Sequence, residues 1–390
     1  MPLRHTFNRR QLLALGSLIL AQPLVSCASL STPTGVEGSL YLSAASDRDD
    51  QHWVKGFTLH DGQVNLQFKQ ALPGRAHHIA VHQENALFVV VARRPGRYLL
   101  VGDLNSGEVL ANIDIPQDRH LFGHGIFSAD GEYFYCPESD YQNAQGESGR
   151  VAVWSVQKSS RKVSFERVQD FPSYGVGPHE LLLMPDQKTL VLANGGIRTH
   201  PDSGREKLNL DSMRPSLVYI DAQSGKLLEK RAFFNEFHQA SIRHLDVNAT
   251  GKVVLAMQYE GEPFKVAPLL ATHQQGQDLK VFKVPEMVRQ TMKQYVGSTR
   301  FDSSGRFIAA SCPRGNMITL WDAESGEFIE KLKSRDGCGV CATQDGFLFT
   351  AGTGRINHYN LDLQKLESVD VLPGQEKTFW DNHLTKAELA

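Results

Sequence analysis

Short runs of apolar residues recur along the chain and are separated by polar turns, a pattern typical of β-strands. The clearest unit spans Gly175 to Lys230. Within it, Leu181–Met184, Thr189–Ala193 and Leu217–Asp221 are β-rich runs, and a turn after the third leads into a fourth. Four short strands joined by tight turns make one blade of a β-propeller.

One connection in this unit is much longer than a hairpin turn. About twenty mostly polar residues, Asn194–Pro215, replace the two to five that usually join neighbouring strands. Loops of this length are usually either functional or disordered, so this segment is the main elaboration of the repeat.

The same unit recurs with a period of about fifty residues, within the range expected of propeller repeats. Six repeats begin at His77, His124, Gly175, His244, Ser298 and Cys338. A seventh blade is assembled from both ends of the chain: three strands in 38–70, and a fourth from the C-terminal segment, with Asp381–Leu384 paired with Ser39 onward. We therefore predict an all-β fold over 38–384, a seven-bladed β-propeller of four-stranded antiparallel blades closed by N- and C-terminal strands, with six or eight blades as alternatives.

Histidine recurs where the first strand of a blade opens onto the central channel. The positions are His77 or His78, His124, His179, His244 and, from the C-terminal segment, His383. Because neutral imidazole suits iron, copper or zinc, we predict a metal site at this mouth from His78, His124, His179 and His244. The spacing to the following turn differs by one residue between blades, so all rings can face the axis only if a bulge intervenes. In the alternative reading, each histidine bonds the backbone of a neighbouring blade.

The loops over the same mouth are polar and rich in arginine. Guanidinium groups bind carboxylate or phosphate through two hydrogen bonds at once. We predict that an anionic ligand, or a metal carried by an anionic chelator, is held by Arg75, Arg198, His200, Arg205 and Arg243.

The first thirty residues resemble an export signal. Arg9-Arg10 precedes the apolar run Ala14–Leu24, as in twin-arginine signals, and Cys27 ends a stretch resembling a lipobox, where lipidation or plain cleavage are both open. We expect a periplasmic protein, free or tethered to a membrane through Cys27. With 390 residues and a formal net charge of −2, the chain can bury a full core, and non-specific nucleic-acid binding is not expected.

Known catalytic motifs are missing from the sequence. It has no GxSxG, HExxH, phosphate loop or dinucleotide fingerprint. Cys338 and Cys341 form a CxxC, but Ala342 stands where covalent haem attachment needs histidine, which leaves a disulfide or two buried thiols.

Several segments together resemble a bacterial family called domain of unknown function 1513. They are the twin-arginine start, ARRPGR, GHGIFSADGEYFY, GPHELLLMPDQKTLVLANGGIRTHPDSGREKLNLDSMRPSL, SIRHL, YVGS and CGV. The resemblance covers nearly the whole mature chain and implies a YVTN-type or quinoprotein-like propeller. It further implies, by gene association, partners among imelysin-type iron-uptake proteins and di-haem peroxidase-like proteins. The family assigns no reaction.

Three functions follow as hypotheses. The first is a periplasmic propeller that binds a transition metal (iron or copper), haem or an anionic metal chelate at the mouth, as an accessory of iron acquisition. The second is a protein-interaction scaffold in a periplasmic uptake complex, with structural histidines. The third is a lactonase-like or quinoprotein-like enzyme.

Overall fold

The computed structural model describes residues 38–94, 96–142, 146–159, 162–204, 206–232, 235–371 and 377–388. All of them belong to one compact unit. The export signal, the lipobox around Cys27 and Arg205 lie outside the described residues.

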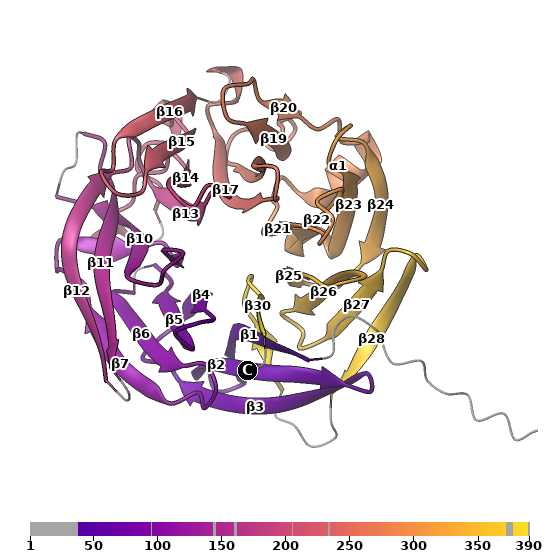
Figure 1. Cartoon of the computed structure of the whole chain (residues 1–390). Helices are drawn as coiled ribbons and strands as arrows, with labels where there is room; N and C mark the ends of the chain where they lie inside the picture. The colour runs from indigo at the N-terminus through magenta and orange to yellow at the C-terminus, as the bar shows by residue number, and fades with distance from the viewer. Residues whose placement is uncertain are drawn as a thin grey trace, which may run out of the picture. The chain divides into compact units, whose positions relative to one another are not determined.

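Seven antiparallel blades follow one another around a common axis (Figure 1). Blade 1 contains β4 (Ala76–His82), β5 (Leu87–Ala92), β6 (Tyr98–Asp103) and β7 (Val109–Asp114). Blade 2 contains β8 (Arg119–Leu121), β9 (Ile126–Phe127), β10 (Tyr133–Asp140), β11 (Gly149–Ser159) and β12 (Lys162–Pro172). Blade 3 contains β13 (Pro178–Leu183), β14 (Thr189–Asn194), β15 (Ser216–Asp221) and β16 (Leu227–Ala232). Blade 4 contains β17 (Ala240–Val247), β18 (Lys252–Tyr259), β19 (Leu270–Gln274) and β20 (Lys280–Val281). Blade 5 contains β21 (Ser298–Phe301), β22 (Phe307–Cys312), β23 (Met317–Asp322) and β24 (Phe328–Lys333). Blade 6 contains β25 (Gly337–Ala342), β26 (Gly346–Ala351), β27 (Ile356–Asn360) and β28 (Lys365–Val371). The closing blade contains β1 (Ser39–Ser46), β2 (His52–His60), β3 (Gln63–Ala71), β29 (Phe379–Trp380) and β30 (Thr385–Glu388).

Helices are few and short in the described part of the chain. They are α1 (Glu286–Met292) and the 3-10 turns η1 (Pro201–Ser203), η2 (Leu210–Ser212), η3 (Asn235–Phe237) and η4 (Pro313–Gly315). None of these has the length and apolar character that crossing a membrane requires.

The predicted closure of the ring from both ends of the chain is confirmed. β1 pairs with β29 and with β30, so the C-terminal segment supplies the broken innermost strand of the closing blade. The innermost strands then contact one another in a complete circle: β4, β9, β13, β17, β21, β25, β30 and back to β4. On the outside, β28 and β3 pair in parallel and join blade 6 to the closing blade.

The burial of each strand follows its position in the blade. All six residues of Leu87–Ala92 in β5 are buried, because a middle strand is covered by the neighbouring blade on both faces. The outer strand β12, Lys162–Pro172, alternates exposed and half-buried residues along most of its length. The core is therefore distributed as apolar layers between blades, which holds each innermost strand in a fixed position around the axis.

Repeated turns fix the spacing between the outer strands. In blade 1, the Asp103 carboxylate accepts hydrogen bonds from the backbone N–H groups of Asn105 and Ser106 and from the Ser106 hydroxyl. Gly107 follows with φ +74°, a conformation that glycine adopts without strain. The corresponding aspartates of blades 3 and 5 make the same bonds.

Candidate functional site

Six histidine rings gather at one opening of the central channel, where the innermost strands begin. Neighbouring ring centroids lie 4.4 to 6.0 Å apart. The six are His77, His78, His124, His179, His244 and His383. Five different parts of the chain therefore meet here, and all but His78 are buried.

Backbone bulges bring these rings onto one face. The register of β4 against β5 shifts between Ala76 and Ile79. A similar shift occurs in β17, between Ile242 and His244, and another at the start of β13. Each extra residue reverses the direction of the side chains before it, so the one-residue differences in spacing are absorbed at the channel mouth.

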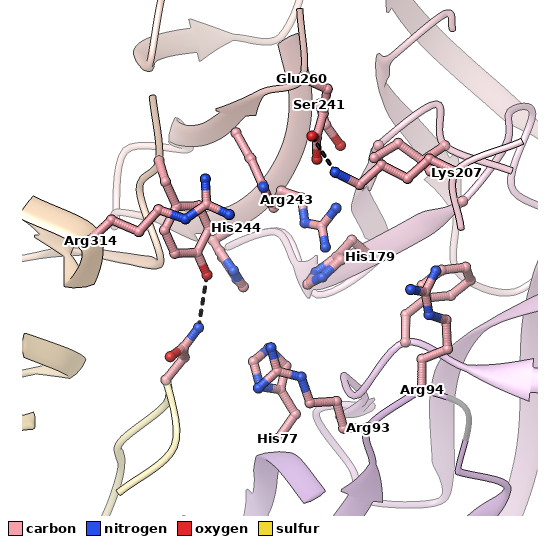
Figure 2. Close-up of a pocket in the computed structure, with 17 residues that line it drawn as sticks. His77, Arg93, Arg94, His179, Lys207, Ser241, Arg243, His244, Glu260 and Arg314 are labelled. Atoms are coloured by element: carbon pink, nitrogen blue, oxygen red, sulfur yellow. Dashed lines mark hydrogen bonds and ion pairs between the residues drawn. The ribbon is translucent and has the colours of Figure 1, made fainter. Parts of the chain in front are cut away.

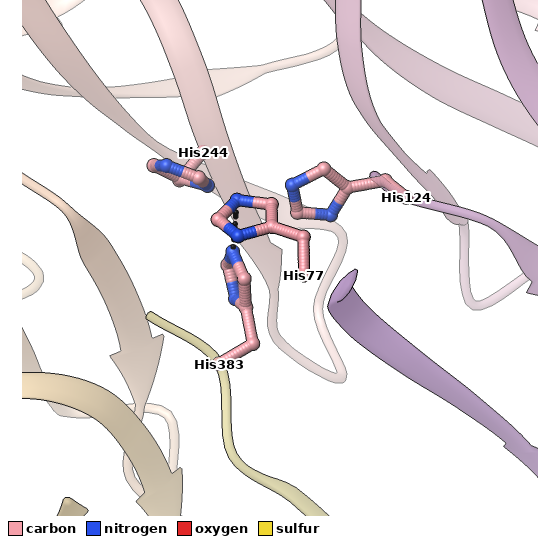
Figure 3. A group of neighbouring side chains, drawn as sticks. All are labelled: His77, His124, His244 and His383. Carbon is pink, nitrogen blue, oxygen red and sulfur yellow. Dashed lines mark hydrogen bonds between the residues drawn. The ribbon is translucent and has the colours of Figure 1, made fainter. Parts of the chain in front are cut away.

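Four of the histidines place ligand atoms close enough for one ion (Figure 3). One ring nitrogen from each of His77, His124, His244 and His383 lies within 4.8 Å of the other three. Metal–nitrogen bonds of about 2.0–2.1 Å put the ligand atoms of a tetrahedral site about 3.3 Å apart. The Nε2 atoms of His77 and His383, which share a hydrogen bond, lie 3.2 Å apart and match this spacing, while the four-atom set as a whole lies within 4.8 Å.

Buried carboxylates orient two of these imidazoles. Nδ1 of His77 lies 2.7 Å from Oδ1 of Asp381, and Nδ1 of His244 lies 3.2 Å from Oε2 of Glu180. In each pair the Nδ1–H group donates a hydrogen bond to the carboxylate, which leaves the lone pair on Nε2. A carboxylate behind a histidine in this way fixes the tautomer and increases the basicity of a metal ligand.

Cationic side chains keep both carboxylates ionised. Burial works to raise the Asp381 pKa, but the hydrogen bond with His77 and the charges of Arg93 and Arg75 lower it well below its usual range. Burial acts on the Glu180 pKa in the same way, and the His244 hydrogen bond and Arg300 lower it overall. The carboxylates therefore remain hydrogen-bond acceptors at neutral pH.

The six imidazoles are neutral at physiological pH. Burial lowers the pKa of His77 to about 3 and that of His78 to about 4. Burial lowers the pKa values of His124, His179 and His383 well below the usual 6.5. It also lowers the pKa of His244. Neutral imidazole is the form that coordinates a metal, so no proton competes for the lone pairs near pH 7.

Several buried ring nitrogens of the cluster lack a hydrogen-bond partner. Both ring nitrogens of His124 are buried without a hydrogen-bond partner, and so is Nδ1 of each of His78, His179 and His383. A buried polar atom without a partner costs about 1–3 kcal/mol. Coordination of an ion by His124 would remove part of that cost, so these residues fit a metal.

A cavity of about 450 Å³ lies over the cluster (Figure 2). His77, His179 and His244 form part of its wall. The rest comes from the beginnings of innermost strands and from the loops between second and third strands, as the repeat geometry predicted. Phe122 and Ile197 are its apolar contributors, and the other side chains are mainly polar.

The wall of the cavity carries an excess of positive charge. It contains Arg93, Arg94, Lys207, Arg243 and Arg314, and one carboxylate, Glu260. Glu260 is paired with Lys207, and Arg93 is paired with Asp381. Arg243 has no carboxylate within ion-pair distance among the described residues, and burial lowers the pKa of its guanidinium.

Some of the residues predicted for the site belong to the histidine cluster or line the cavity, and others do not. His124 and His244 belong to the four-nitrogen set, while the rings of His78 and His179 lie at its border. Arg243 lines the cavity. Arg75 forms an ion pair with Asp381, whose carboxylate holds the His77 ring.

Two of the predicted long-loop residues, Arg198 and His200, are not part of the cavity wall. The Arg198 guanidinium donates to the Gly146 carbonyl. His200 caps η1 by accepting from the Asp202 N–H. Both side chains anchor the loop between Asn194 and Pro215, whereas Ile197 and Lys207 of the same loop line the cavity.

Sequence reasoning missed the two carboxylates that support the cluster. Asp381 lies two residues before His383, and Glu180 directly follows His179, so both stand beside histidines that had been singled out. Adjacent acidic residues were the available signal. For Glu180 the pairing could not be expected, because a residue next to a histidine in a regular strand points to the opposite face, and the register shift at the start of β13 changes this direction.

The comparisons with known proteins define the family and the fold. The model of the family described as "Protein of unknown function (DUF1513)" matches residues 70–387. No curated protein matches the sequence.

Solved structures with similar folds have very different sequences. Hydrazine synthase from Kuenenia stuttgartiensis superposes with a TM-score of 0.56 and 14% identity, covering 90% of this chain and 100% of that one. A "putative 6-phosphogluconolactonase" from Bacteroides fragilis NCTC 9343 gives 0.63 and 11%, covering 91% and 99%. A functionally unknown protein from Desulfotomaculum acetoxidans DSM 771 gives 0.51 and 11%, covering 80% and 89%. At these identities the likeness concerns the fold alone.

Proposed function

This chain belongs to the DUF1513 family, and from that premise we propose that it is a metal-binding propeller whose mouth holds one first-row transition-metal ion. The ligands are His77, His124, His244 and His383. The observation that carries the proposal is the convergence of four buried, neutral imidazoles from four separate segments within 4.8 Å.

The donor set favours iron(II), copper(II) or zinc over magnesium or calcium. Four imidazole nitrogens suit borderline transition ions, whereas hard cations prefer oxygen ligands. Asp381 and Glu180 lie behind the ligands and orient them, as carboxylates do in many histidine metal sites. The nitrogens enclose the space of a single ion, which favours a bare ion or a small chelate over haem.

Metal analysis and titration test this proposal directly. The purified full-length protein is expected to contain close to one equivalent of a transition metal, and the metal-free protein to bind one equivalent of cobalt(II) with the absorption of a nitrogen-ligated ion. His124→Ala is expected to abolish stoichiometric binding. His120→Ala is the matched control, because His120 is equally buried but stands outside the four-nitrogen set. Equal binding by both variants and the parent protein would contradict the proposal.

The cellular part of the proposal is a periplasmic accessory of iron acquisition. It is supported by the sequence of the first thirty residues and by the family resemblance. Replacement of Arg9 and Arg10 by lysine is expected to keep the protein in the cytoplasm, and Cys27→Ser to prevent incorporation of labelled fatty acid. Fractionation that finds both variants distributed as the parent protein would remove the export route from the proposal.

A further inference from the structure

The cavity above the histidine cluster has the features of an anion-binding site. Its volume, about 450 Å³, lies in the range of small-molecule pockets, roughly 300–1,000 Å³. Five basic side chains line it against one carboxylate. Lys207 is paired with that carboxylate and Arg93 with Asp381, which leaves Arg243 without a carboxylate partner among the described residues. A cavity wall with this charge attracts anions.

Two side chains on one wall are left with unused donors. The Arg243 side chain points into the cavity (Figure 2), and no described carboxylate lies within ion-pair distance of it. The Ser241 hydroxyl, on the same strand and also lining the cavity, is buried without a hydrogen-bond partner. Arg243 is half-buried, so its guanidinium loses part of its hydration without a counter-charge, a cost that an anion with several oxygens would offset.

The cavity and the histidine cluster share a wall. His77 and His244, two of the four proposed metal ligands, also line the cavity. An ion held by the imidazoles would therefore be accessible from the cavity. A tetrahedral ion that expands to five ligands, or an octahedral one, has a coordination position for an oxygen from that side.

We propose that the cavity binds a small polyanion carrying carboxylate or phosphate oxygens, which are held by Arg243 and Ser241 while one oxygen completes the coordination of the metal. This inference rests on the proposed function, because the co-ligand role requires a metal in the cluster. The anion and the metal then bind with positive coupling. By linkage, each increases the affinity for the other by the same factor.

Calorimetric titration of the full-length protein tests the proposal with two probes, inorganic phosphate and the tricarboxylate tricarballylate. Both are titrated into metal-free and zinc-loaded protein. The zinc-loaded form is expected to bind one probe or both at least tenfold more tightly. Preference between the probes distinguishes a phosphate ligand from a carboxylate ligand.

Substitution of Arg243 tests the anion site separately from the metal site. Arg243→Met keeps the length of the side chain and removes its charge. It is expected to weaken anion binding by about 10- to 100-fold, as the loss of charged hydrogen bonds does, and to leave zinc affinity in the absence of anion within about threefold. Arg198→Met is the matched control, because Arg198 belongs to the mouth loops but does not line the cavity.

The results of these titrations distinguish between failure of the anion site, of the co-ligand role and of the metal site. Anion binding that is unchanged in Arg243→Met, or weakened equally in Arg198→Met, would overturn the anion site while the metal site stands. Anion binding through Arg243 in a protein that binds no metal would overturn both the co-ligand role and the proposed function. Equal anion affinity of metal-free and zinc-loaded protein would overturn the coupling alone.

Discussion

The Nε2 atoms of His77 and His383 lie 3.2 Å apart, although 306 residues separate the two histidines. His77 begins the innermost strand of blade 1, whereas His383 lies between β29 and β30 in the closing blade. The Ser43 hydroxyl donates to the His383 carbonyl and holds this segment against β1. The contact that closes the ring is therefore also part of the proposed metal site, so metal binding and ring closure should be linked.

Removal of the proposed ligand His383 should lower the part of the unfolding free energy that metal binding adds, and leave the stability of the metal-free protein nearly unchanged. A ligand that binds only the folded state at 100 times its Kd adds about 2.7 kcal/mol to the free energy of unfolding. His383→Ala is expected to lose most of this increment while changing the stability of the metal-free protein much less. Denaturation in the presence of chelator measures the stability of the metal-free protein, and denaturation in saturating zinc measures that of the zinc-bound protein. An unchanged zinc increment in the variant would exclude His383 as a ligand.

The buried carboxylate behind His77 should control metal affinity. Asp381→Asn removes the charge that fixes the His77 tautomer, and loss of such a partner typically lowers metal affinity by about 10- to 100-fold. The variant also leaves Arg75 and Arg93 without their counter-charge. Both arginines are partly exposed, so the free energy of unfolding should fall by less than the about 3–5 kcal/mol of a fully buried pair. Competition with a chromophoric chelator measures the affinity.

A second carboxylate–histidine pair provides the control for Asp381. Oδ1 of Asp345 lies 2.9 Å from Nε2 of His358, which is buried and stands outside the four-nitrogen set. Asp345→Asn is expected to lower stability but to leave metal affinity unchanged. If both variants lose affinity equally, general destabilisation explains the loss and the positioning role of Asp381 is wrong.

The metal-free protein should lose stability as the pH falls below about 6.5. Burial holds the pKa of His77 at about 3 and that of His78 at about 4 in the folded chain, against 6.5 when exposed. Between these values the unfolded state binds more protons, so the free energy of unfolding decreases with falling pH. Each such histidine contributes at most about 1.4 kcal/mol per pH unit.

Urea denaturation of metal-free protein at several pH values between about 8 and 5 measures this dependence. His124→Gln should show a shallower slope, because it removes one buried imidazole whose pKa is lowered by burial and by the neighbouring histidines. A pH-independent free energy of unfolding over this range would mean that the imidazoles are accessible to protons in the folded state.

Glycine at position 123 should be required for the geometry of the cluster. A Cβ atom there would lie 2.6 Å from Cβ of His77, and the residue has φ +98°. Gly123→Ala is therefore expected to displace the His77 ring, weaken metal binding and destabilise the protein. Gly276→Ala is the control, since Gly276 has φ +81° with nothing near the new Cβ atom and should cost only about 1 kcal/mol. Zinc affinity that is equal in both variants would contradict the steric argument.

The blades and their number follow from local pattern. Runs such as Leu87–Ala92 are apolar throughout because a middle strand is covered on both faces, and turns such as Asp103–Gly107 recur because the same hydrogen bonds close them. The incomplete N-terminal repeat required a strand from the other end of the chain, which the segment around His383 supplies. The blades depend on residues close in sequence, and the closure follows from an incomplete repeat at each end of the chain. The sequence by itself therefore determined the propeller, its closure and the presence of histidine at the mouth.

The direction of each side chain depended on tertiary structure. Whether His77 or His78 faces the axis is decided by the bulge between Ala76 and Ile79, and a shift of one residue moves a side chain to the opposite face. The pairing of Asp381 with His77, and of Glu180 with His244, joins residues 304 and 64 positions apart. Such contacts arise only when blades are packed around an axis, because burial and backbone register, rather than local residue order, decide which polar groups meet.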